Sequence, residues 1–215
     1  MPRVYLVDQR HANSQLAVQS VPPGDLGLLI NPFLSVSEVV GQVLDAIIPP
    51  QGRKQSVRHS RQNEPESFLI SELRILAYSS GDELLLGWGI HPRNAAQLAP
   101  LAPHMRTGAS GRCLLLGCNV AVGPRRTERY LGGAAVGQRF GMPFNGWEPE
   151  ELGLSQAPGY ALLHAFARTL GVPTTAAIES QTAAIDWSFT GPTLTVGPFG
   201  QTTFAGMDMP ASVDL

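Results

Sequence analysis

Two cysteines, Cys113 and Cys118, are the residues of this chain with the clearest chemical use, and they lie in an apolar run that continues to Ala121. The segment between them has the length and composition of a buried strand, which ends at Gly117 and brings Cys118 to the loop that follows. Ligands in open α/β sheets bind just beyond the carboxyl ends of the strands. The Cys118 thiol is therefore expected where a nucleophile would act, although free cysteines are also typical small buried hydrophobic residues.

The two cysteines are not expected to form a disulfide. Their odd separation turns the side chains to opposite faces of one strand, unless the strand ends before Cys118. Two free thiols suit a reducing compartment. The sequence begins without a basic and then apolar signal, and no apolar run approaches the roughly 20 residues of a membrane span. We expect a cytoplasmic protein that does not enter a membrane, with secretion by a signal-less system as the alternative.

Residues 116–121 resemble the Gly-Cys-Asn-Val-Ala segment of the DUF4347 family, a bacterial group similar to the caspase-like, clan CD cysteine peptidases. Residues 73–87 resemble a second block of that family, in which a strand runs into a His-Gly turn and a short Leu-x-Leu-Gly strand. Residues 186–189 and 194–196 resemble its closing hairpin, which bears a tryptophan. The resemblance extends over residues 70–197 and implies a caspase-like fold.

The resemblance also implies a cysteine peptidase site in which Cys118 is the nucleophile. Such a site needs an imidazole that takes the thiol proton and then protonates the leaving amine. The family's histidine belongs in the turn after Leu76, where this chain has Tyr78 instead. A phenol with a pKa near ~10 is a poor base at neutral pH. The resemblance therefore implies the fold more strongly than the activity.

His91 is the best substitute base, because it follows a short apolar segment and could fold back toward the site. A surface-loop imidazole before Pro92 is the alternative interpretation. Backbone amides in the turns near Cys118 would hold an oxyanion. The remaining oxyanion or cleft residues are expected at the same edge of the sheet: Gly81, Gly117, Asn119 and Gln181.

Composition and missing motifs exclude several function classes. The 215 residues, of which 43% are hydrophobic, are enough for one domain, 1–215, with a single core. A formal charge of -2 with scattered basic residues argues against a nucleic-acid partner. The sequence has no P-loop, no dinucleotide fingerprint, no Gly-x-Ser-x-Gly elbow and no zinc-ligand spacing. No cofactor and no metal are predicted.

Apolar runs alternate with helical patterns, which predicts an α/β three-layer sandwich with a mostly parallel sheet and helices on both faces. Central strands are expected at 26–30, 73–77, 114–117 and 174–178, with a shorter candidate at 4–7. The stretch between this last candidate and Gly24 is polar and predicts no element. A hairpin is expected around Gly81.

Capping residues and the helical spacing of apolar residues predict the helices. Ser35 and Glu38 form a capping box that opens an amphipathic helix extending to Ile47. Residues 94–101 suggest a crossover helix limited by Pro100 and Pro103. Residues 127–140 have a glycine-weakened helical pattern. A further helix at 159–170 is expected to end at Gly171.

Two segments stand apart from these elements. Residues 51–66 are polar and basic and predict an exposed loop. Residues 142–158 suggest an insertion beside the site.

Two functions remain open. The favoured one is a caspase-fold pseudoenzyme that acts as a binding or scaffold module for a protein or peptide ligand. The alternative is a cysteine peptidase or thiol hydrolase that uses Cys118 with a non-standard base, such as His91 or a water held by Tyr78. The sequence does not indicate an oligomeric state.

Overall fold

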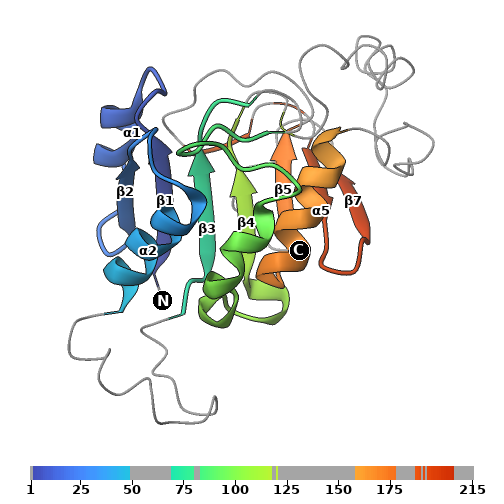
Figure 1. Cartoon of the computed structure of the whole chain (residues 1–215). Coiled ribbons are helices and arrows are strands. Elements are labelled where there is room, and N and C mark those ends of the chain that lie inside the picture. Colours follow the sequence, from blue (N-terminus) through green and yellow to red (C-terminus); the bar gives the residue numbers. More distant parts are fainter. Residues whose placement is uncertain are drawn as a thin grey trace.

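A mostly parallel sheet forms the centre of the protein (Figure 1). The computed structural model describes residues 2–48, 69–79, 83–117, 120, 158–177, 187–189, 191 and 193–205. Within these residues, seven strands form one sheet in the order β2-β1-β3-β4-β5-β6-β7. The predicted α/β architecture is thus confirmed. The segments 51–66, 127–140 and 142–157, for which a loop, a helix and an insertion were predicted, lie outside the described residues.

The strands β1 to β5 are parallel to one another, β6 pairs antiparallel with β5, and β7 pairs antiparallel with β6. Their bounds are β1 (Arg3–Asp8), β2 (Leu26–Ile30), β3 (Glu72–Leu76), β4 (Arg112–Leu115), β5 (Thr174–Ala177), β6 (Thr193–Val196) and β7 (Thr202–Ala205). The prediction that 26–30 is a central strand was wrong, because β2 is the edge strand beside β1. Four of its five residues are only partly buried, whereas β1 is buried along almost its whole length.

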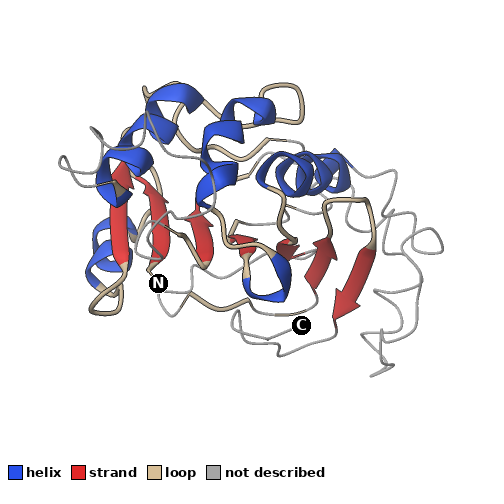
Figure 2. Ribbon diagram, turned by 90° about the horizontal axis from the view of Figure 1, so that it is seen from below, coloured by secondary structure: helices blue, strands red, loops and turns tan. Residues whose placement is uncertain are grey.

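The helices cover both faces of the sheet (Figure 2). Three of them pack on one face: α2 (Val36–Ile47), the 3₁₀ helix η2 (Ala95–His104) and α5 (Pro158–Leu170). The short helix α1 (Ser14–Gln19) packs on the other, and η3 (Gly108–Ser110) is a single turn before β4. Neither α1 nor β7 was predicted, because each is too short to show a clear period.

Local signals placed both ends of α2 and the end of α5 correctly, but not the end of η2. The Ser35 and Glu38 capping box opens α2, and Gly171 ends α5 with a positive φ of 72°. The predicted limit on η2 was wrong, because this helix continues through Pro100 and Pro103 to His104. Proline removes an N–H donor, but its fixed φ of about -65° suits a 3₁₀ helix.

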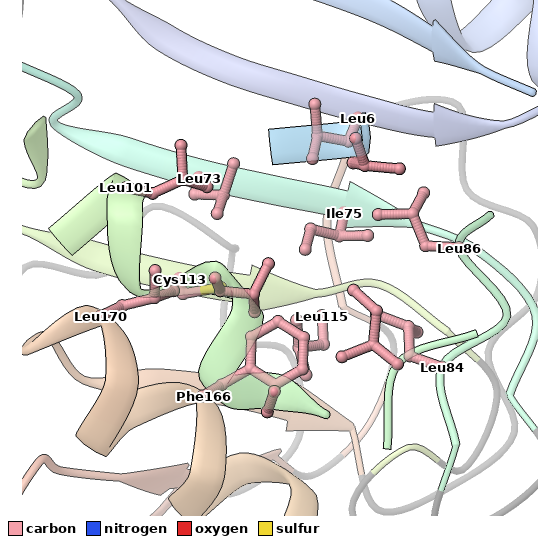
Figure 3. Packing of buried hydrophobic residues seen from close by; sticks show 14 of the residues in the cluster. Leu6, Leu73, Ile75, Leu84, Leu86, Leu101, Cys113, Leu115, Phe166 and Leu170 are labelled. Atoms are coloured by element: carbon pink, nitrogen blue, oxygen red, sulfur yellow. The ribbon is translucent and has the colours of Figure 1, made fainter. Parts of the chain in front are cut away.

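The larger part of the core lies between the sheet and α2, η2 and α5 (Figure 3). Cys113 of β4 is fully buried there, in one cluster with Leu115, Phe166 and Leu170. Burial raises the pKa of its thiol far above the ordinary value. Cys113 is a free cysteine and, in this setting, an unreactive packing residue.

The opposite face of the sheet carries a smaller core with a buried ionic network. Glu72 of β3 forms ion pairs with both Arg74 and Arg112. Arg74 also donates a hydrogen bond to the Trp187 carbonyl oxygen and lies 5.3 Å from the centre of the Tyr5 ring. The Trp187 ring meets Tyr5 edge-on, which fixes the segment 187–189 against β1 and β3.

Candidate functional site

The carboxyl ends of β1 and β3 form the topological switch point of the sheet. From β1 the chain moves outward to β2, then returns past β1 to β3 and continues in the other direction to β4 and β5. In doubly wound sheets of this 2-1-3-4-5 order, ligands bind at the switch point, because the connections leave on opposite faces and open a crevice there. A ligand site is therefore expected at the residues that follow β1 and β3.

Asp8, the last residue of β1, holds the loops at this edge together. Its carboxylate is fully buried and accepts two side-chain hydrogen bonds of 2.8 Å from Arg10. It also accepts one from the Gly87 backbone N–H, at 3.1 Å. Arg10 in turn donates to the carbonyl oxygens of Leu85 and Gly87, at 2.7 and 2.6 Å. Asp8 and Arg10 thus fix the 85–89 loop, from a different part of the chain, over the end of β1.

The Arg10 guanidinium is held firmly in its charged form. Its hydrogen bonds to Asp8 raise its pKa, and the nearby carboxylates of Asp8 and Glu83 add to this effect against the cost of burial. The pair is electrically neutral as a unit. Its role at this edge is to position backbone.

His11 and Tyr78 lie against each other across the switch point. The two rings are 5.2 Å apart, centre to centre, with an angle of 30° between their planes. The Tyr78 hydroxyl accepts a 3.3 Å hydrogen bond from the Ala12 backbone N–H. His11 is almost fully buried, and burial lowers the pKa of its imidazole, with the Asp8 carboxylate opposing part of this effect. Near neutral pH, His11 is therefore uncharged. We refer to Asp8, Arg10, His11 and Tyr78 as the strand-end cluster.

The ends of β3 and β4 come together as expected for adjacent strands. A β-carbon at Gly117 would lie 2.6 Å from the Ala77 carbonyl oxygen, so only glycine permits this approach. Tyr78 follows Ala77 in the chain, as Cys118 follows Gly117. Four predicted site residues, Gly81, Cys118, Asn119 and Gln181, lie outside the described residues. Ser79 and Leu84, which lie on either side of Gly81 in the chain, form an antiparallel bridge.

His91 lies in a turn of its own beyond the 85–89 loop. Its Nδ1 accepts a 3.1 Å hydrogen bond from the Arg93 backbone N–H, and its own backbone N–H donates to the Asn94 side chain at 2.8 Å. In the neutral imidazole, the proton then resides on Nε2. His91 is therefore a turn-forming residue whose acceptor nitrogen already has a partner.

His11 has the same arrangement. Its Nδ1 accepts a 3.4 Å hydrogen bond from the Asn13 backbone N–H, which again assigns the proton to Nε2. The other two described imidazoles belong to the opposite edge of the sheet. His104 adjoins Ile70, which precedes β3, and His164 faces the turn after β6. Of the imidazoles that the structure describes at the carboxyl edge, neither presents a free acceptor nitrogen.

Large apolar side chains are exposed around this edge. Of the five that are exposed among the described residues, four belong to elements that begin or turn there: Phe33 (78%), Trp88 (70%), Leu16 (53%) and Tyr78 (39%). The fifth, Phe199 (93%), lies in the β6–β7 turn at the other edge. The Trp88 backbone N–H donates to the Leu34 carbonyl oxygen at 2.8 Å, so the loops that carry Phe33 and Trp88 are neighbours.

Sequence reasoning did not identify Asp8, Arg10 or His11 as site residues. The available signal was an acidic residue directly after an apolar strand with an arginine two positions later, which places both at a strand end. His11 could not be placed, because its neighbour Tyr78 is far away in the sequence.

Comparisons with known proteins and the distribution of side chains add three findings. No family model, curated protein or solved structure matches this chain. Over the described ranges, the histidine, cysteine and acidic side chains do not gather in a group of three or more that would hold a metal ion. None of the helices that the structure describes has the length and apolar character to cross a membrane.

Proposed function

We propose that this chain is a caspase-fold pseudoenzyme: a cytoplasmic binding or scaffold module for a protein or peptide ligand, without a Cys-His catalytic pair. The observation that carries the proposal is the state of the strand-end cluster. The turn after β3 holds Tyr78, whose hydroxyl and ring are engaged with Ala12 and His11. The place that the family resemblance gives to a catalytic imidazole is filled by a phenol.

The two imidazoles at this edge do not supply the missing base. A general base must offer an unprotonated nitrogen to the thiol. In both His11 and His91, the acceptor nitrogen Nδ1 receives a backbone N–H from two residues further on. Each ring would have to give up that hydrogen bond and change its tautomer before it could accept the proton of Cys118.

The exposed side chains at the same edge support a binding role. Aromatic residues are enriched at the centres of protein interfaces, where tryptophan and tyrosine often dominate the binding energy. Phe33, Tyr78 and Trp88 are all exposed here, and Asp8 and Arg10 fix the backbone that carries Trp88. A surface with rigid aromatic anchors is what a binding module needs.

Thiol labelling across pH tests the proposal. Cys113 is buried and unreactive in the native protein, so a thiol-reactive electrophile reports on Cys118 alone, and Cys118→Ala is the control. We expect the labelling rate of wild type to rise with an apparent pKa near the free-thiol value of about 8.5. Tyr78→His should move that rise to lower pH, because an imidazole next to the thiol stabilises the thiolate.

The contrary result would support the thiol hydrolase instead. If wild type labels with an apparent pKa well below that of a free thiol, and His11→Phe or His91→Gln abolishes the effect, Cys118 has a functional base and the pseudoenzyme proposal fails. If Cys118 does not label at any pH in the native protein but labels after unfolding, it has no catalytic use, and the proposal stands.

A further inference from the structure

We propose that the surface formed by Phe33 and Trp88 binds a cationic segment, rich in arginine or lysine, of a partner protein. This inference rests on the proposed binding function and names the chemistry of its ligand. It begins from the two most exposed aromatic side chains at the carboxyl edge. We call this surface the Phe33–Trp88 surface.

The two loops that form this surface are joined through their backbones. Besides the hydrogen bond between Trp88 and Leu34, Gly87 adopts a positive φ of 60°, and a β-carbon there would overlap the Leu34 carbonyl oxygen. The same hypothetical β-carbon would contact Val39 of α2 at 3.4 Å. The backbone segments that carry Phe33 and Trp88 thus pack against each other at the start of α2.

Two carboxylates lie against the residues that adjoin this pair of rings in the chain. Glu38 accepts hydrogen bonds of 2.7 Å from the Ser35 backbone N–H and hydroxyl. These bonds hold its carboxylate at Ser35, two positions after Phe33 in the chain. Those bonds lower the Glu38 pKa, so the group is ionised at neutral pH. Glu83 approaches the other loop closely, because a β-carbon at Gly89 would overlap its carboxylate. Gly89 directly follows Trp88.

The described cations nearby do not cancel this negative charge. Arg10 is matched by the buried Asp8 carboxylate with which it pairs. Arg93 is exposed on the following turn, and a formal count of Glu38, Glu83 and Arg93 leaves one negative charge among these described groups. A guanidinium or ammonium group is attracted to the face of exposed aromatic rings and also to the carboxylates. A purely apolar ligand would contact the rings but not pair with the carboxylates, and an acidic ligand would be repelled by them.

Fluorescence polarisation with two labelled peptides tests the inference. One nonapeptide alternates arginine and glycine, and its matched control alternates glutamate and glycine. We expect the arginine peptide to bind the full chain saturably and the glutamate peptide not to bind. Trp88→Ala and Phe33→Ala should each weaken binding by about fivefold, as expected for loss of a cation–π contact.

Charge and position are tested with further variants. Glu83→Gln and Glu38→Gln should each weaken binding by about threefold, and glutamine at position 38 still serves as a capping residue. Phe199→Ala is the matched control, because it removes an even more exposed aromatic ring from the opposite edge of the sheet. That variant should bind as wild type does.

The inference is overturned if the arginine peptide does not bind at millimolar concentration, if the glutamate peptide binds as tightly, or if Phe199→Ala loses as much affinity as Trp88→Ala. None of these results alters the outcome of thiol labelling at Cys118. Conversely, an activated Cys118 would end the pseudoenzyme proposal and leave peptide binding at the Phe33–Trp88 surface intact. The two proposals therefore fail separately.

Discussion

Replacing Asp8 by asparagine tests whether the strand-end cluster holds the edge of the sheet together. The change Asp8→Asn keeps the size of the side chain and removes its charge. The buried carboxylate accepts three hydrogen bonds from the Arg10 guanidinium and the Gly87 backbone N–H. An amide offers one accepting oxygen and one donating nitrogen in its place. At least one donor would then face another donor, and Arg10 would lose its counter-ion.

The size of the effect follows from burial. Removing one partner of a buried ion pair costs about 3–5 kcal/mol, because the other charge is left without compensation. Asp8 is fully buried, but the Arg10 side chain is 37% exposed and can regain some hydration. We therefore expect the lower end of that range, about 3 kcal/mol of unfolding free energy. For a domain of this size, that corresponds to a fall in Tm of roughly 6–12 °C.

Urea unfolding followed by circular dichroism measures this loss, and a double-mutant cycle isolates the pair. Arg10→Met removes the guanidinium, and Asp8→Asn/Arg10→Met removes both charges. The double variant should be more stable than the sum of the single losses predicts, by at least about 1.5 kcal/mol. If the losses of the two single variants simply add, or if Asp8→Asn costs less than about 1 kcal/mol, the ion pair does not hold this edge and the reasoning is wrong.

Three further predictions concern other parts of the chain. The pKa of His11 is lower in the folded protein than the ordinary value of 6.5, so the unfolded chain binds more protons. Stability should therefore fall as pH drops through 6.5 toward the lowered folded pKa. His11→Phe keeps a ring against Tyr78 and should remove this pH dependence. Glu72→Gln should cost about 3 kcal/mol, because it leaves Arg74 buried without a carboxylate. Gly87→Ala should cost about 2 kcal/mol or more, from its positive φ and the overlap with a carbonyl oxygen.

Each of these predictions can be contradicted by a specific measurement or variant. Urea midpoints at several pH values should diverge between wild type and His11→Phe on the acid side, and parallel curves would contradict the assignment. Glu72→Gln/Arg74→Met should recover part of the loss, whereas equal losses would mean that Glu72 acts without its partner. Gly41 lies in the middle of α2, and a β-carbon there would meet no atom within 4 Å. Gly41→Ala should therefore be neutral or stabilising by up to about 1 kcal/mol. A similar loss at both glycines would refute the argument from backbone conformation.

The local features of the fold were readable from the sequence. The Ser35 and Glu38 box determined where α2 begins, and Gly171 determined where α5 ends, because both signals act on hydrogen bonds within a few residues. The apolar runs gave the parallel strands for a related reason. Burial on both faces demands continuous hydrophobic segments, wherever a strand lies in the sheet.

Tertiary structure alone decided the order of the strands and the composition of the site. An apolar run shows that a strand is buried but not which strands flank it, so Leu26–Ile30 was expected at the centre and lies at the edge. The contact of His11 with Tyr78, and that of Asp8 with Gly87, join residues far apart in the sequence. Such pairs depend on the path of the whole chain across the sheet. The residue types were visible in the sequence, whereas their meeting at the switch point required the fold.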